Sequence, residues 1–309
     1  MITSLKDNIQ LIDIDGQKYI LKFYSNSIDR LRITFFEKLQ NFTSDYLNIS
    51  PKILSNTKNE LNFVLGDSIF ELYEYTESIE FDDKKVVVVE DFYYDVGNFL
   101  GKLHNAFSEY SKTTSDIFKS ELHLYENSAN EMNQLLSLYK EKNIGSPWKN
   151  ILEEKIAIAS STVLDTNTLS ALPRGIVHGD FYPKNILFDD QMQIIGLIDY
   201  AQAGDFIRCY EVIRALVQTT KYLHQIDIDP INLKSFLQGY LKNSPLQQVE
   251  LDNMLDLFIY IQASDIFFNS IATITGNDKG LQDYAQFRYQ NLISLSKNRQ
   301  LLNKNIHEI

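Results

Sequence analysis

Alternating apolar and polar residues predict a strand-rich region over residues 1–75. The period of two is typical of half-buried strands, and short turns containing glycine join neighbouring runs. Two hairpins are predicted, Ile9 to Ile14 with Gln17 to Tyr24 around the turn Asp15-Gly16, and Leu61 to Leu65 with Ile69 to Tyr75 around the turn Gly66-Asp67. We therefore expect a small antiparallel sheet at the start of the chain.

Between the two hairpins the apolar period changes to that of a helix. The predicted buried stripe consists of Ile28, Leu31, Arg32, Phe35, Phe36 and Leu39. Ser27 is expected to cap the N-terminus of this helix, and Pro51 stops the pattern.

Beyond residue 80 the pattern is mostly helical. Helices are predicted over 92–107 and near 130–142, 148–162, 207–222, 231–242, 249–273 and 280–296. Gly97 and Gly101 on the first of them would let a neighbouring helix approach closely. One further hairpin is predicted inside this half, Ile186 to Phe188 with Gln193 to Ile198 around Asp189-Asp190. The expected fold is α+β, with a small sheet lobe over 1–75 and a larger helical lobe over 76–309.

Charge and cysteine content exclude several classes of function. The net charge of −12 disfavours a nucleic-acid-binding or anionic-membrane-binding surface, since either needs a cationic face. Cys209 is the single cysteine, so it forms no intrachain disulfide and no cysteine-based zinc site, and we expect it to be buried. No apolar run is long enough for a signal peptide or a membrane span. We expect a cytoplasmic protein that binds neither nucleic acid nor membrane.

The chemistry concentrates in Asp180, Asn185 and Asp199, with the predicted hairpin between the last two. Phosphoryl transfer requires positioning and charge neutralisation, and Mg²⁺ prefers carboxylate and amide oxygens. Asp180 would accept the hydroxyl proton, while Asn185 and Asp199 would hold the metal. The alternative is that Asp180 caps a turn and Asp199 ends a strand. His178, the hairpin and the Ile198-Asp199 pair favour the functional interpretation.

This segment resembles the Brenner motif of the aminoglycoside phosphotransferase and choline kinase families, which share the protein-kinase-like fold. The motif reads H-G-D-x4-N followed by I-D, and it begins here at His178. The resemblance extends to Leu100 to His104 and to the hinge-like segment Phe70 to Tyr75. It implies an ATP- and Mg²⁺-dependent kinase whose nucleotide contacts lie at Lys22, Glu71 and Tyr73.

Several positions depart from the family pattern or stay open. No glycine-rich phosphate loop precedes Lys22, and Glu211 stands where the families usually carry Asp. The helix carboxylate that would pair with Lys22 is unassigned, since Glu37 and Asp29 both lie off the apolar stripe. His178 and His104 are expected to be structural, with His178 holding the loop around Asp180. Two roles stay open for Lys184: it could stabilise a transferring phosphoryl group, or it could face solvent.

The acceptor is the least defined part of the prediction. Asp205, Glu211 and Asp265 are candidates to contact a cationic substrate. An amino acid, an amino sugar and an aminoglycoside all stay open as acceptors, and Leu172 to Gly175 resembles bacterial homoserine kinases of this fold. A non-catalytic relative that binds nucleotide is the alternative outside enzymes.

Overall fold

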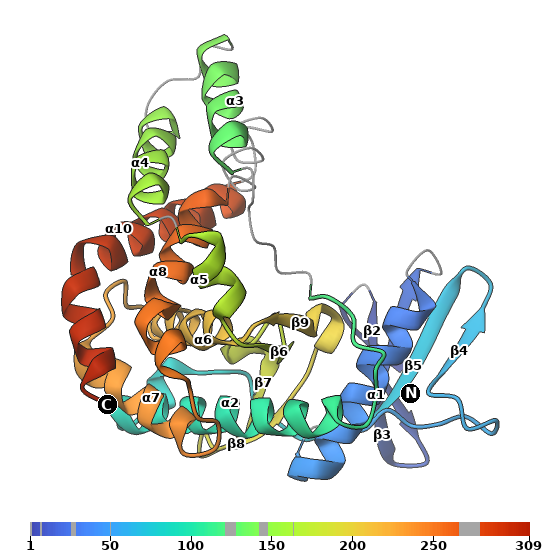
Figure 1. Ribbon diagram of the computed structural model, residues 1–309. Coiled ribbons are helices and arrows are strands. Elements are labelled where there is room, and N and C mark those ends of the chain that lie inside the picture. Colours follow the sequence, from blue (N-terminus) through green and yellow to red (C-terminus); the bar gives the residue numbers. More distant parts are fainter. Residues whose placement is uncertain are drawn as a thin grey trace.

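The chain forms a small sheet with one helix against it, followed by a larger, mostly helical body (Figure 1). The computed structural model describes residues 2–6, 8–25, 29–49, 51–120, 128–141, 148–162, 164–265 and 279–309. This arrangement confirms the α+β, two-lobed architecture. The boundary predicted near Tyr75 falls directly after the last strand of the sheet.

The sheet is antiparallel and has the strand order β1-β2-β3-β5-β4. Its strands are β1 Ile2–Lys6, β2 Ile9–Ile14, β3 Gln17–Ser25, β4 Asn62–Leu65 and β5 Ser68–Glu74. Both predicted hairpins are confirmed. Strand β1 was not predicted, because its sequence Ile-Thr-Ser-Leu-Lys lacks a strict apolar alternation. It pairs with β2 at the edge of the sheet.

Helix α1 (Arg30–Leu47) begins later than predicted. The Asp29 side chain caps it by accepting a hydrogen bond of 2.9 Å from the amide of Leu31. The predicted cap Ser27 lies outside the described residues. Leu31 is 70% exposed, so its place in the buried stripe was wrong. The buried face is rotated and includes Glu37, whose burial an apolar pattern does not reveal.

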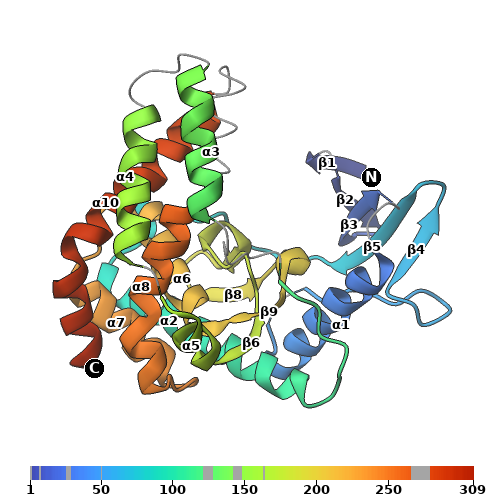
Figure 2. The same cartoon turned by 45° about the horizontal axis from the view of Figure 1, so that its top comes forward.

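Eight helices make up most of the described part of the body, and α3 and α4 stand out from it in both views (Figures 1 and 2). They are α2 Val89–Ser111, α3 Ser128–Glu141, α4 Trp148–Ser161, α5 Thr166–Ala171, α6 Arg208–Tyr222, α7 Pro230–Leu241, α8 Gln248–Ser264 and α10 Lys279–His307. The short helix α5 was not predicted, and α10 runs past the predicted end. The predicted continuation of α8 over 266–273 lies outside the described residues. None of the described helices is both long and apolar enough to cross a lipid bilayer.

Short strands and turns connect the helices near the middle of the chain. The predicted hairpin is confirmed as β7 Ile186–Phe188 with β8 Ile194–Leu197. A second antiparallel pair, β6 Arg174–Val177 with β9 Gly204–Ile207, was not predicted, because each strand has only four residues and contains a glycine. The described part of the body also contains three 3₁₀ turns, η1 Asp83–Lys85, η2 Pro183–Asn185 and η3 Tyr200–Gln202.

Helices α2 and α7 pack in direct backbone contact. A Cβ atom at Gly97 would overlap the main-chain oxygen of Phe236, and one at Gly101 would overlap that of Tyr240. Gly239 on α7 makes the reciprocal contact with Tyr94. The close approach predicted from Gly97 and Gly101 is therefore confirmed.

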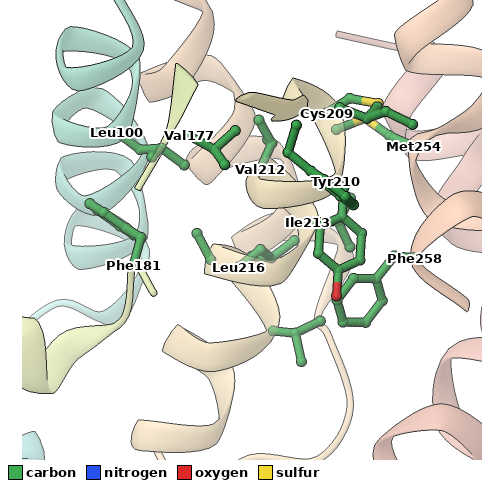
Figure 3. Packing of buried hydrophobic residues seen from close by; sticks show 14 of the residues in the cluster. Leu100, Val177, Phe181, Cys209, Tyr210, Val212, Ile213, Leu216, Met254 and Phe258 are labelled. Atoms are coloured by element: carbon green, nitrogen blue, oxygen red, sulfur yellow. The ribbon is translucent and has the colours of Figure 1, made fainter. Parts of the chain in front are cut away.

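Helix α6 lies at the centre of the core of the helical body. Its apolar side chains pack against α2 on one side and α8 on the other (Figure 3). Cys209 is fully buried beside Met254, as predicted, and burial raises the pKa of its thiol. A buried, protonated thiol is a poor nucleophile, which agrees with a packing role. This core fixes α6, whose side chains reach the loop that follows β6.

Candidate active site

The loop after β6 brings the predicted catalytic residues together. The amide nitrogen of the Asn185 side chain donates to the main-chain oxygen of Asp180 at 2.8 Å and to its Oδ2 at 3.2 Å. The hairpin that follows returns the chain to the same place, because the amide of Ile198 donates to the main-chain oxygen of Asn185 at 2.9 Å. Asp199 follows Ile198 directly. Asp180, Asn185 and Asp199 thus occupy one site.

Asp199 also forms a contact with a residue of the N-terminal sheet. Lys22 of β3 places its Nζ 3.1 Å from Asp199 Oδ1, which joins residues 177 positions apart. The Asp199 side chain is 45% exposed, so its carboxylate is open to a ligand. Its backbone lies in the left-handed region, at φ 67° and ψ 64°. A residue other than glycine rarely adopts this conformation, and such positions cluster at functional sites.

Glu211 of α6 is hydrogen-bonded to the loop that follows β6. Its Oε2 accepts from the amide of His178 at 2.8 Å, and its Oε1 accepts from the amide of Gly179 at 2.6 Å. His104 of α2 donates its Nε2 proton to Oε2 at 2.9 Å. Burial alone would raise the pKa of Glu211, but the contacts with His104 and the loop lower it. Glu211 is therefore a buried carboxylate that fixes the loop.

His178 supports Asp180 from inside the same loop. The amide of Asp180 donates to His178 Nδ1 at 3.3 Å, so this nitrogen carries no proton. Burial lowers the pKa of His178, which keeps the ring neutral. The ring packs edge-on against Tyr200, with 4.9 Å between ring centroids. The predicted structural roles of His178 and His104 are both confirmed by these contacts.

Arg214 was missed by the sequence analysis. Its Nη2 donates to Asp180 Oδ1 at 2.9 Å, so a cation from α6 orients the central carboxylate. A signal was present, because Arg214 is the one charge within the buried run Val212 to Leu216. A charge inside an apolar run needs a partner.

Comparisons with known proteins identify the family of this chain. The model of the phosphotransferase enzyme family matches residues 5–247. The chain belongs to this family. A homoserine kinase from Zymomonas mobilis is 22% identical over 249 residues, covering 78% of this chain and 70% of its own.

Solved structures show the same fold. An aminoglycoside phosphotransferase from Alicyclobacillus acidocaldarius superposes with a TM-score of 0.70 at 14% identity, covering 100% of this chain and 91% of its own. A choline kinase from Streptococcus pneumoniae has a TM-score of 0.54 at 14% identity, with coverage of 96% and 92%. The family resemblance predicted from the motif at His178 is confirmed.

In this phosphotransferase the hinge-like residues Glu71 and Tyr73 lie on β5, the strand next to the one that carries Lys22. Glu71 of β5 is paired in register with Lys22 of β3 and is fully buried. Its Oε2 accepts from the hydroxyls of Tyr24, at 3.0 Å, and of Tyr73. Glu71 and Tyr73 are therefore packed inside the sheet lobe, and their contact with a nucleotide stays a prediction.

Glu37, one of the two helix carboxylates considered as partners of Lys22, is buried. It lies beside Glu71, and the side-chain amide of Asn62 donates to both of its oxygens, at 2.8 and 3.1 Å. Burial, together with the neighbouring Glu71 carboxyl, raises the pKa of Glu37 to about 8. Glu71 of this carboxyl pair is the cross-strand neighbour of Lys22, whereas the Lys22 ammonium is paired with Asp199.

The three acidic residues predicted to meet a cationic substrate have protein partners. Asp205 of β9 accepts from Arg174 Nε at 2.8 Å, and Asp265, which follows α8, accepts from Arg288 Nη1 at 2.7 Å. Substrate contact by Asp205 and Asp265 stays a prediction. For Glu211 the contacts described above indicate a structural role instead, because its oxygens are enclosed by the loop and α2.

The donor set fits a magnesium ion. With its amide nitrogen turned to Asp180, Asn185 directs its Oδ1 elsewhere, and Asp199 adds a carboxylate. Mg²⁺ is usually held by one or two protein oxygens together with water and substrate phosphates. Within the described residues no group of three His, Cys, Asp or Glu side chains is placed to hold a metal.

A Glu211→Gln substitution is expected to lower the free energy of unfolding by about 1–3 kcal/mol, because a donor would then face the loop amides and leave a buried group unsatisfied. Thermal and urea unfolding measure this loss. The lowered pKa means that the stabilisation from Glu211 is present above about pH 4.3 and is lost as the pH falls through its folded value. Glu109→Gln, on the exposed face of α2, is the matched control. Equal melting temperatures for both variants would contradict the loop-holding role.

Proposed function

We propose that this phosphotransferase moves the γ-phosphoryl group of ATP to a hydroxyl of a small molecule. The observation that carries the proposal is the convergence of Lys22, from the sheet, on Asp199, beside Asp180 and Asn185. A cation for the nucleotide phosphates, oxygen ligands for a metal and a proton acceptor therefore occupy one place. Phosphoryl transfer needs these parts and little covalent help.

Asp180 is the group suited to receive the proton of the acceptor hydroxyl. Arg214 and Asn185 orient its carboxylate. As the hydroxyl oxygen bonds to the γ-phosphorus, the bond to the β–γ bridging oxygen breaks, ADP leaves, and the proton passes to Asp180. Lys22 binds the phosphates, and Asn185 with Asp199 would hold Mg²⁺, which neutralises charge on the transferred group.

The edge hairpin compensates for the missing glycine-rich loop. Ile9, at the start of β2, pairs with Lys22, and Asn8 just before it accepts a hydrogen bond of 3.1 Å from the amide of Phe23. The start of β2, with Asn8 before it, is thus held beside Lys22. We propose that its backbone covers the phosphates.

ATP consumption over a panel of hydroxyl compounds tests the function. The panel contains L-homoserine, glucosamine, choline and an aminoglycoside, with Mg²⁺ present. We expect acceptor-dependent release of ADP and a new phosphate ester, detected by phosphorus NMR. Nucleotide binding without acceptor-dependent turnover, over this panel extended to other small alcohols, would favour the non-catalytic relative.

A further inference from the structure

Arg32 lies in the first turn of α1, within the stripe that the sequence predicts to be buried. A cation is unfavourable at this end of a helix, because the partial charge of the helix N-terminus is also positive. Its side chain has no part in the proposed transfer reaction. Helix α1 packs on the sheet through the rings of Phe36 and Tyr24, and on its other side it contacts α2 and η3 (Figure 2). A side chain of α1 can therefore connect the two lobes.

Arg32 makes this connection at the turn that follows Asp199. Its Nη2 donates to the main-chain oxygen of Ala201 at 3.2 Å, which joins residues 169 positions apart. Its Nη1 lies 3.5 Å from the main-chain oxygen of Lys119. Ala201 belongs to η3, and η3 begins directly after Asp199. A helix of the sheet lobe is thus hydrogen-bonded to the turn that carries the proposed metal ligand.

The next carbonyl of the same turn is bound by Ser120. Its hydroxyl donates to the main-chain oxygen of Gln202 at 2.8 Å. Ser120 is itself fixed to β9, because its amide donates to the main-chain oxygen of Asp205 at 3.2 Å. Two consecutive carbonyls of η3 are therefore held by different segments, one by Arg32 of the sheet lobe and one by Ser120 of the helical body.

The backbone of Asp199 needs support of this kind. A residue other than glycine stays in the left-handed region, here at φ 67° and ψ 64°, only where the surrounding structure imposes it. On one side of Asp199, the amide of Ile198 is bound to the main-chain oxygen of Asn185. On the other side, Ala201 is bound to Arg32. Loss of the Arg32 contact would loosen the turn and let the Asp199 carboxylate shift.

We propose that Arg32 is a positioning residue, which acts through η3 to hold the Asp199 carboxylate where it binds the metal of Mg-ATP. This inference rests on the proposed function, because it takes Asp199 as a metal ligand. Since Arg32 belongs to α1, the metal site is fully formed only when α1 lies against η3.

Titration calorimetry with ATP, with and without Mg²⁺, tests the role of Arg32. In Arg32→Gln we expect the magnesium-dependent gain in affinity to fall about 10-fold, as for loss of one charge-assisted hydrogen bond. Affinity for ATP without Mg²⁺ should change little. Arg32→Lys keeps a charged donor, so it should show a smaller loss, and it serves as the test should Arg32→Gln fail to fold. Lys38→Gln removes one positive charge from the exposed side of the same helix and should keep the full gain.

A second measurement reports on the turn without any ligand. The amide of Ala203 closes η3 by donating to the main-chain oxygen of Tyr200 at 2.9 Å. Hydrogen exchange of this amide, followed by NMR, should be faster in Arg32→Gln than in the unmodified protein, and unchanged in Lys38→Gln. A general loss of stability would instead raise exchange throughout the helical body.

An unchanged magnesium-dependent gain in Arg32→Gln, or an unchanged exchange rate of Ala203, would overturn the positioning role. Calorimetry needs no acceptor, so the two proposals fail in different measurements. A gain that depends on Arg32, in a protein that phosphorylates no acceptor, would leave the positioning role standing and remove the transfer reaction. Normal transfer with an unchanged gain in the variant would do the reverse. Absence of any magnesium-dependent gain in the unmodified protein would overturn both.

Discussion

Replacing Asp180 with alanine is expected to lower kcat by about 10²- to 10⁴-fold, the range for removal of a positioned proton acceptor. The reason is that this carboxylate, held by Asn185 and Arg214, has no equivalent near it in the loop. Steady-state kinetics at saturating ATP and acceptor measure the loss, while nucleotide affinity should change little.

Two further variants make this result specific. Asp180→Asn keeps the shape and the hydrogen bond with Arg214, so it should be as slow as the alanine variant but closer to the unmodified protein in melting temperature. Asp190→Ala, in the exposed turn between β7 and β8, should keep full activity. Unchanged turnover in Asp180→Asn would show that the negative charge of Asp180 is not required for the reaction.

Replacing Asp199 with alanine is expected to abolish productive Mg-ATP binding. Asp199 supplies the exposed carboxylate of the proposed metal site, and it faces Lys22 at 3.1 Å. Titration calorimetry with ATP, with and without Mg²⁺, measures the effect. The magnesium-dependent gain in affinity should vanish.

Asp199→Asn separates charge from backbone conformation, since Asn tolerates the left-handed region as well as Asp does. We expect it to lose the magnesium-dependent affinity like the alanine variant, because the negative charge is gone. A magnesium effect equal to that of the unmodified protein in either variant would exclude Asp199 as a metal ligand.

The parts of the site that are local in sequence were predictable. Asp180, Asn185 and Asp199 lie on one loop and one hairpin, so their spacing determines that they meet. The hairpins of the sheet lobe followed from apolar alternation and turn residues. Strands β6 and β9, of four residues each, are too short to show a period.

Features that depend on packing between distant segments were not predictable. The burial of Glu37 requires α1 to pack on β4, where Asn62 binds it. The pairing of Arg214 with Asp180 requires α6 to lie behind the loop. Periodicity in one segment carries no information about what another segment presents to it.

The pocket lined by Lys155 and Arg288 shows why overall charge is a poor guide to local charge. A net charge of −12 favours cationic ligands only through the average field. Lys155 and Arg288 lie close together in a protein with an acidic surface, and they meet because α4 and α10 both pack against α8. Local charge follows from the tertiary fold.

The left-handed backbone at Asp199 has a consequence for laboratory evolution of this enzyme. Glycine relieves conformational strain at such a position, and strained functional residues are where stability and activity oppose each other. A library selected for heat resistance alone should therefore enrich Asp199→Gly, a variant that we expect to be inactive. A screen for stable and active variants of this protein should therefore include an activity assay in every round.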